Sequence, residues 1–111
     1  RDKTLWCGFA LESSKSVKVL FPGDTAWFDG LEAIGQEYGP FHVAAIPIGA
    51  YEPREFMKFS HINVDEAVRM KDAVRANYAV PIHWGTFPMT IEPTFEPRDR
   101  LIELMKDRED R

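Results

Sequence analysis

Four stretches of the chain have the hydrophobic pattern of β-strands. Residues 5–11 and 16–21 are apolar or alternating runs separated by a short polar cluster, and this pattern predicts a hairpin. Residues 42–49 are almost all apolar, which is typical of a strand covered on both faces, and Pro47 should mark its end or an edge of the sheet. Residues 78–84 form the fourth apolar run and predict a further strand.

Three other stretches have helical periodicity. Residues 31–38 predict a short helix that ends at a glycine, although Gly35 lowers the helix propensity of this segment. Residues 64–77 carry an apolar stripe and follow Asn63, a residue type that favours the N-cap position. A last helix is predicted to open at Pro97. The resulting order, β-β-α-β-α-β-α, indicates an α/β layered fold.

The composition indicates one globular unit without a strong attraction for polyanions. The 111 residues are enough for one domain, and 44% of them are hydrophobic and 29% charged, as in soluble globular proteins. Fourteen basic and eighteen acidic residues give a net charge of −4, which argues against a nucleic-acid partner. Residues 1–111 are therefore expected to form one continuous unit.

The cysteine content and the absence of membrane segments bear on the compartment. The single cysteine, Cys7, cannot form an intramolecular disulfide and fits a reducing compartment; it is interpreted as a small apolar residue within a strand. No apolar stretch approaches the roughly 20 residues that span a bilayer, and the first residues are unlike a signal peptide. We expect an intracellular protein, cytoplasmic or peripheral to a membrane, and a chain that begins within a longer protein.

A carboxylate follows the second predicted strand at a Pro-Gly turn. Residues 21–25 have the sequence FPGDT, so Asp24 lies just beyond the end of a strand, where α/β proteins place ligand-binding groups. The alternative for this short motif is an Asx turn or a helix N-cap, and the motif alone favours that structural role. Asp24 is thus a candidate site residue that needs further support.

Two histidines are further candidates. His83 lies at the end of the fourth predicted strand, where it could bind a metal or transfer protons, and a core histidine is an equally good interpretation. His61 lies in a loop just before the best-defined helix, so a phosphate there would meet backbone N–H groups with Arg54 and Lys58 nearby. The alternative for His61 is a solvent-exposed loop histidine. His42, at the start of a strand, is interpreted as structural.

Asp24, His61 and His83 are more informative together than singly. A carboxylate and imidazoles that converge at one edge of a sheet are typical of hydrolytic zinc sites. The set is incomplete, because a catalytic zinc ion needs three protein ligands and a water molecule. The chain contains no His-x-His, His-Glu-x-x-His or cysteine-pair motif that would supply the rest.

Several motifs of the chain resemble a known family. The GDT sequence at residues 23–25, followed by IHWGTF at residues 82–87, resembles the C-terminal half of the metallo-β-lactamase superfamily. More narrowly, AIPIGAYEPR at residues 45–54, with the FMK sequence and His61 that follow, is similar to the N-acyl-phosphatidylethanolamine phospholipase D family. The similarity extends from about residue 5 to residue 87.

The resemblance implies a fold and a set of roles. The fold would be half of an αβ/βα four-layer sandwich, with two zinc ions at one edge. Asp24 would be the carboxylate that bridges the two zinc ions, and His83 would be the last histidine ligand of one of them. His61 would act in catalysis beside the substrate phosphate, and Tyr51 would contact the substrate. The implied reaction is hydrolysis of a phospholipid at a membrane surface, which releases an N-acylethanolamine and leaves phosphatidate.

Two departures from the family pattern limit this transfer. The His-x-His-x-Asp-His motif and a further histidine ligand of the family are absent, so the chain alone is expected to be inactive. A half sandwich would also expose the inner face of its sheet, which predicts poor solubility, a homodimer or an excerpt from a longer chain. The second departure is Val64, where the family tends to have proline; we expect the helix cap to survive.

Two other functions are compatible with the sequence. One is another hydrolase of the same superfamily, such as a lactonase or a phosphodiesterase that acts on nucleotides or nucleic acids. The other belongs to a different class: a truncated, metal-free module that binds a partner and has no catalytic role.

Overall fold

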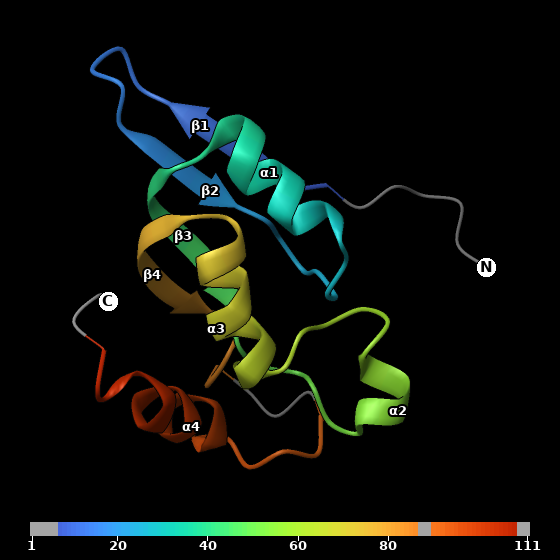
Figure 1. Cartoon of the computed structure of the whole chain (residues 1–111). Helices are drawn as coiled ribbons and strands as arrows, with labels where there is room; N and C mark the ends of the chain where they lie inside the picture. The colour runs from blue at the N-terminus through green and yellow to red at the C-terminus, as the bar shows by residue number, and fades with distance from the viewer. Residues whose placement is uncertain (1–6, 87–89, 109–111) are drawn as a thin grey trace.

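The computed structural model describes residues 7–86 and 90–108 as a mixed four-stranded sheet with helices (Figure 1). Its elements are β1 (Phe9–Glu12), β2 (Lys18–Phe21), α1 (Gly30–Tyr38), β3 (Phe41–Pro47), α2 (Arg54–Met57), α3 (Val64–Ala73), β4 (Ala76–Ile82) and α4 (Glu96–Met105). The strand order is β1-β2-β3-β4, with β1 antiparallel to β2 and the other neighbours parallel. The expected α/β class is confirmed, and α1 and α3 lie on the same side of the sheet (Figure 1).

The core lies between the sheet and the two helices α1 and α3. Leu20, Ala44 and Ile46 point from the strands toward this layer and are fully or almost fully buried. Leu31 from α1 and Met70 from α3 close it from the other side. Burial of each large apolar side chain contributes about 1.5–3 kcal/mol, so this layer fixes both helices on one face of the sheet.

Gly35 lies where α1 crosses α3. A Cβ atom at this position would collide with the carbonyl oxygen of Ala73, the last residue of α3. The glycine that lowers the helix propensity of α1 therefore permits close packing of the two helices, and the predicted helix forms with Gly39 as its C-cap.

The predicted hairpin forms, but its first strand is shorter than expected. Phe9 pairs with Phe21, and the next residue of β2 would be Pro22, which has no N–H to continue the ladder. Cys7 therefore lies before β1 and is exposed, so its interpretation as a residue within a strand was wrong. The first two residues of the predicted strand, 5 and 6, lie outside the described residues.

The helix predicted over residues 64–77 ends earlier, at Ala73. Val74 is its C-cap, and Arg75 has a positive φ of 62° that turns the chain toward the sheet. β4 then begins at Ala76, which pairs with Phe41 of β3. Pairing with the full length of β3 competes with the helical periodicity of this segment, and the long-range pairing prevails.

The segment from 42 to 60 differs from the sequence analysis in two respects. Pro47 ends β3 as predicted, but β3 lies between β2 and β4, so the alternative of a sheet edge was wrong. The short helix α2, which precedes the loop that carries His61, was not predicted. Its hydrogen bonds from Phe56 and Met57 to the carbonyl of Pro53 form a single turn, too short to give a periodic hydrophobic signal.

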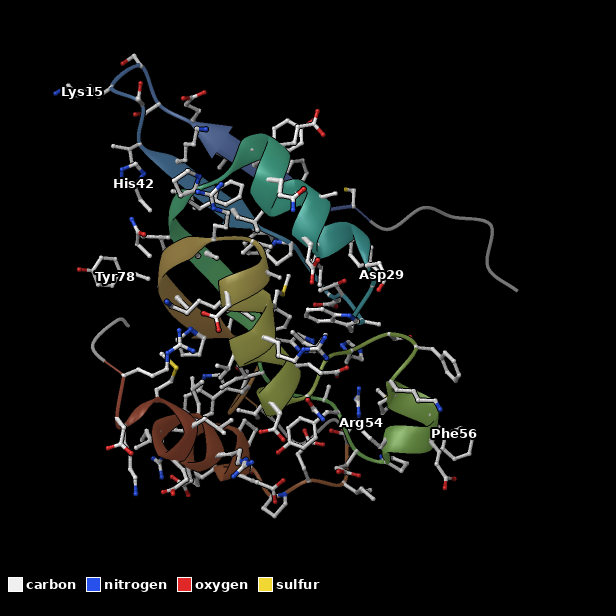
Figure 2. The ribbon with its side chains drawn as sticks, in the orientation of Figure 1. Lys15, Asp29, His42, Arg54, Phe56 and Tyr78 are labelled. Carbon is white, nitrogen blue, oxygen red and sulfur yellow. The ribbon has the colours of Figure 1, made fainter. Side chains whose placement is uncertain are left out.

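The face of the sheet opposite α1 and α3 is apolar and open. The cross-strand pairs Leu11–Val19, Val19–Val43 and Val43–Tyr78 form a row over all four strands. Leu11 and Tyr78 are 59% and 56% exposed, and Val80 in the next row is also exposed. Tyr78 projects outward from the body of the molecule (Figure 2). Within the residues that the structure describes, β3 is covered on one face only, so the expectation of a strand covered on both faces was wrong and the expected exposed sheet face is present.

This open face should make the 111-residue chain self-associate. Leu11→Lys combined with Val80→Lys places two charges on the face without altering the core layer, so we expect less association and weaker binding of a hydrophobic dye. Sedimentation velocity and dye fluorescence measure both effects. Val17→Lys with Ile102→Lys, two exposed apolar residues outside the paired rows, is the matched control. Equal association of the two double variants would contradict the prediction.

Candidate functional site

Asp24 and His83 lie together at the carboxyl edge of the sheet. Asp24 follows β2 in a turn in which Gly23 has a φ of 74°, and its side chain is 61% exposed. His83 follows β4 directly, and its side chain is 21% exposed. The Oδ1 atom of Asp24 is 3.5 Å from the Nε2 atom of His83. Parallel strands end at the same edge, which is why residues so distant in sequence meet here.

The strand predicted over residues 78–84 lies at Ala76–Ile82 instead, so His83 occupies a turn rather than a strand position. The N–H of Ile48 donates to the carbonyl of Ile82, and this is where the pairing stops. His83 then adopts a φ of 64°, in the left-handed region that non-glycine residues rarely enter. Strain of this kind is concentrated at functional sites, where the surrounding structure holds it.

His61 joins this pair from the loop between α2 and α3. Its ring stacks on that of His83, with the ring centroids 5.0 Å apart and the planes 18° from parallel. The Nδ1 atoms of both rings are buried and have no hydrogen-bond partner within residues 7–86 and 90–108. Burial lowers the pKa of His61 and the neighbouring His83 lowers it further, while Asp24 opposes the shift. The sequence-predicted residues Asp24, His61 and His83 therefore form one cluster with unused polar atoms.

The backbone beside His83 comes close to the end of β3. A Cβ atom at Gly49 would collide with the carbonyl oxygen of His83, so a glycine is required for this approach. A cavity of about 230 Å³ opens on the same side, with Ala50, His83, Trp84 and Glu92 among its lining residues. Neither Asp24 nor His61 lines it, so the cavity adjoins the cluster only through His83.

The distance between Asp24 and His83 is compatible with two ligands of one metal ion. In a tetrahedral zinc site with bonds of about 2.0–2.2 Å, ligand atoms lie roughly 3.3–3.5 Å apart, and the two side chains meet at 3.5 Å. The described part of the chain holds no group of three or more His, Cys, Asp or Glu residues suited to a metal. These residues thus fit two positions of a metal site and do not fill it.

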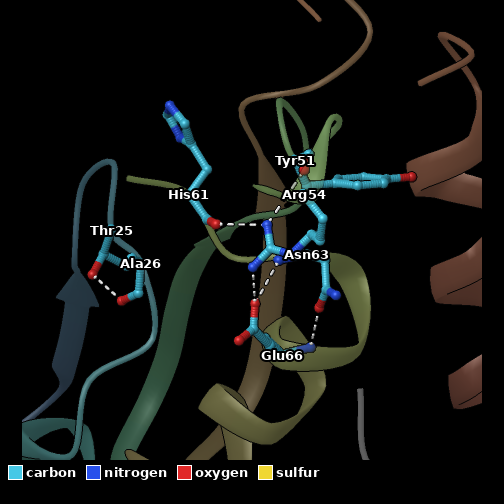
Figure 3. Close-up of polar contacts among 7 residues, drawn as sticks. All are labelled: Thr25, Ala26, Tyr51, Arg54, His61, Asn63 and Glu66. Carbon is cyan, nitrogen blue, oxygen red and sulfur yellow. Dashed lines mark hydrogen bonds and ion pairs between the residues drawn. The ribbon is translucent and has the colours of Figure 1, made fainter. Parts of the chain in front are cut away.

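Arg54 does not face the cluster as the sequence suggested. Its Nη1 donates to the carbonyl oxygen of His61 at 3.0 Å, and its Nη2 lies 2.6 Å from Oε1 of Glu66 (Figure 3). The guanidinium is therefore engaged by the protein and is not directed at a phosphate. Lys58 is exposed, with its amine 5.1 Å from the ring centroid of Phe59.

The first turn of α3 is closed by a capping box. Asn63 Oδ1 accepts from the Glu66 N–H at 2.8 Å, and Glu66 Oε1 accepts from the Asn63 N–H at 3.0 Å. The predicted N-cap is confirmed despite Val64, and the capping box engages the N–H groups of Asn63 and Glu66. A phosphate at this helix end stays a prediction.

Replacing the cap should measurably weaken α3. Asn63→Ala removes the bond to the Glu66 N–H, and we expect a loss of about 1 kcal/mol in the free energy of unfolding. Denaturant unfolding followed by circular dichroism measures it. Asn77→Ala, at an exposed position of β4, should change this free energy by less than about 0.5 kcal/mol. Similar losses for the two variants would contradict the role of the cap.

Tyr51 is not brought to the cluster. It is only 5% exposed, and its hydroxyl donates to Oε1 of Glu96 at 2.6 Å. Burial raises the pKa of Tyr51, and the bond to Glu96 raises it further. The ring points toward α4, while the His61 imidazole points the other way (Figure 3). A contact between Tyr51 and substrate remains a prediction.

Glu92 is a site residue that sequence analysis missed. Its carboxylate accepts from the N–H groups of Ala50 and Glu52, at 2.7 and 3.0 Å, and from the Thr90 hydroxyl at 2.6 Å. It thereby holds the loop after β3 and lines the cavity beside His83. A single glutamate in an irregular segment has no periodicity or motif that could have identified it.

Comparisons with known proteins agree with this arrangement. A family model described as "Beta-lactamase superfamily domain" matches residues 1–84. The chain is 55% identical over 108 residues, 96% of its length, to N-acyl-phosphatidylethanolamine-hydrolyzing phospholipase D 1 of Caenorhabditis elegans. It is 31% identical over 105 residues, 93% of its length, to the mitochondrial enzyme of that name from Saccharomyces cerevisiae. It spans only 30% and 22% of these two relatives.

A solved structure also supports the fold. The chain is similar to a metallo hydrolase from Ignicoccus hospitalis, with a TM-score of 0.57 and 26% sequence identity. The match covers 82% of this chain and 35% of that protein. No helix in the described part of the chain has the length and apolar character needed to cross a bilayer.

Proposed function

Since the chain belongs to the beta-lactamase superfamily, we propose that the protein carrying it is a zinc-dependent phosphodiesterase of the phospholipase D type. It would hydrolyse N-acyl-phosphatidylethanolamine to an N-acylethanolamine and phosphatidate. The observation that carries this proposal is the cluster of Asp24, His83 and His61 at the carboxyl edge of the sheet. The high identity to a phospholipase D over nearly the whole chain supports the choice of substrate.

Asp24 and His83 are proposed as metal ligands in a site for two zinc ions. Asp24 would bridge both ions and His83 would bind one of them, with the remaining ligands supplied by residues outside this chain. When bound, the ions would polarise the phosphoryl oxygens and lower the pKa of the attacking water. The chain by itself is then expected to be inactive, because two ligands do not complete such a site.

His61 is proposed to bind and orient the substrate phosphate. Burial lowers the pKa of His61 and so favours the neutral ring, which can donate one N–H bond to a phosphoryl oxygen. Water adds its oxygen to phosphorus, the bond from phosphorus to the ethanolamine oxygen breaks, and that oxygen takes a proton. The stacked ring of His83 limits the rotation of His61, which favours one orientation of the donor.

The proposed substrate defines the partner and the place of action. An N-acylated diacyl phospholipid is delivered from a membrane surface, so the protein would act as a peripheral membrane enzyme without a nucleic-acid partner. The open apolar sheet face is compatible with a homodimer or with cover by another part of the protein.

The test is turnover by the protein as its gene encodes it. Vesicles of phosphatidylcholine with N-acyl-phosphatidylethanolamine are incubated with the protein, and N-acylethanolamine release is measured by mass spectrometry. We expect release that a chelator abolishes and added zinc restores. A lactone and a cyclic nucleotide are the comparison substrates. Faster turnover of either one would favour another hydrolase of the superfamily, and a native protein without bound metal would favour the binding module.

A further inference from the structure

The side chain of Arg54 contacts the segment that carries His61. Its Nη1 donates to the carbonyl oxygen of His61 at 3.0 Å and approaches that of Tyr51 at 3.4 Å. Figure 3 shows the guanidinium between the two segments and α3. One side chain thus joins the loop after β3 to the residue that stacks on His83.

Glu66 anchors this arginine to α3. Its Oε1 lies 2.6 Å from Nη2 of Arg54 and also accepts from the Asn63 N–H in the capping box. The two charged side chains are 28% and 23% exposed, so the pair is partly withdrawn from water and is less screened than a surface ion pair. The carbonyl of His61 is therefore held, through Arg54, to the first turn of a packed helix.

The backbone around His61 is fixed on its other sides as well. The His61 N–H donates to the carbonyl of Met57 at 2.8 Å, and the N–H of Ile62 donates to that of Thr25 at 2.9 Å. Thr25 follows Asp24 directly, so this last bond ties the His61 loop to the turn that carries the candidate ligand. Arg54 supplies the remaining restraint, the one on the His61 carbonyl.

We propose that Arg54 is a positioning residue for His61: its guanidinium holds the His61 carbonyl to Glu66 and so fixes the imidazole against His83. This proposal rests on the proposed function, in which His61 orients the phosphate. A displacement of about 1 Å in such a group can cost roughly 100-fold in rate. Arginine suits the role because its planar fork reaches a carbonyl and a carboxylate at once, which the single ammonium of lysine does not.

The test uses Arg54→Gln and Arg54→Lys in the protein as its gene encodes it. We expect kcat for N-acyl-phosphatidylethanolamine to fall roughly 10- to 100-fold in Arg54→Gln, with KM changed less than about threefold. Arg54→Lys should be intermediate, because it keeps the charge near Glu66. Arg100→Gln breaks the exposed ion pair with Asp65 at the same helix end and should leave kcat unchanged.

A second measurement reports on His61 without turnover. Histidine side-chain NMR signals, assigned with His61→Gln, should shift for His61 in both Arg54 variants. The signals of His42, whose Nδ1 accepts from the Lys18 N–H far from this loop, should stay in place. Zinc content should equal that of the wild type, because Asp24 and His83 are intact. A purely structural role would lower the melting temperature but leave the His61 signals and kcat unchanged below it.

The outcomes separate this inference from the proposed function. If the wild type does not hydrolyse the lipid, the proposed function fails, and the NMR shifts alone decide whether Arg54 positions His61. Wild-type kcat together with unmoved His61 signals in Arg54→Lys would overturn the inference. If Arg54→Gln does not fold, Arg54→Lys and Glu66→Gln decide, since Glu66→Gln weakens the same link and keeps a side chain of equal size.

Discussion

Asp24→Ala is expected to lower turnover of N-acyl-phosphatidylethanolamine by roughly 1000-fold and to reduce bound zinc. The proposed metal ions contribute several kcal/mol to the stabilisation of developing charge, and a loss of about 4 kcal/mol corresponds to this factor. The side chain is 61% exposed and contacts His83, so the fold should not depend on it. Initial rates and elemental analysis of the purified protein measure both effects.

The control is Asp29→Ala. Asp29 is an exposed carboxylate just before α1, and its side chain makes no capping hydrogen bond. The substitution therefore removes the same negative charge as Asp24→Ala, a few residues away. We expect wild-type rate and zinc content. Melting temperatures of both variants should lie close to that of the wild type. If the Asp24→Ala protein has wild-type zinc content and wild-type rate, Asp24 is not part of the site and the proposed zinc-dependent activity is contradicted.

Asp24, His61 and His83 were predictable from the sequence because each of them adjoins a recognisable element. Asp24 and His83 each follow an apolar run at a turn, and His61 precedes a capped helix. An α/β order places the ends of parallel strands at one edge, so their convergence follows from topology. The stacking of His61 on His83 did not follow, because it depends on the course of the chain through α2.

The sequence did not reveal the hydrogen-bond partners of two side chains, because these partners are distant in sequence. Arg54 appeared suited to a phosphate, but its partner Glu66 belongs to the capping box of α3. Tyr51 is bonded to Glu96, which lies 45 residues away. The local sequence pattern shows which residues are polar and on which element they lie. It does not show which polar group is their hydrogen-bond partner.

Glu92 is another residue whose hydrogen-bond partners the sequence did not reveal, and its replacement should strongly lower the stability of the fold. Glu92→Ala should lower the free energy of unfolding by about 3 kcal/mol, because it removes hydrogen bonds to a charged acceptor and leaves the N–H groups of Ala50 and Glu52 without it. Denaturant unfolding measures the loss. Glu103→Gln, which alters an exposed carboxylate of α4 near Lys106, should cost less than about 0.5 kcal/mol. Equal losses for the two variants would contradict the prediction.

The contribution of Glu92 to the free energy of unfolding should decrease at acidic pH. Burial alone would raise the pKa of Glu92, but bonds from Thr90 and from the backbone of Glu52 and Ala50 outweigh it and lower the pKa below 4.5. The stabilisation is therefore present above pH 4.5 and is lost as the pH falls through the folded-state pKa. The difference in unfolding free energy between wild type and Glu92→Gln should shrink over that range. A difference that grows with acidity would contradict this assignment.

Ala50 offers an internal check on why Glu92 matters. Its φ of 63° is strained for alanine, and the bond from its N–H to Glu92 holds it there. Ala50→Gly relieves the strain, so Glu92→Gln should cost roughly 1 kcal/mol less in that background than in the wild type. The double-mutant cycle measures this coupling. Additive effects would mean that Glu92 stabilises the loop without compensating for the backbone strain at Ala50. The influence of Glu92 on the cavity beside His83 would then be indirect.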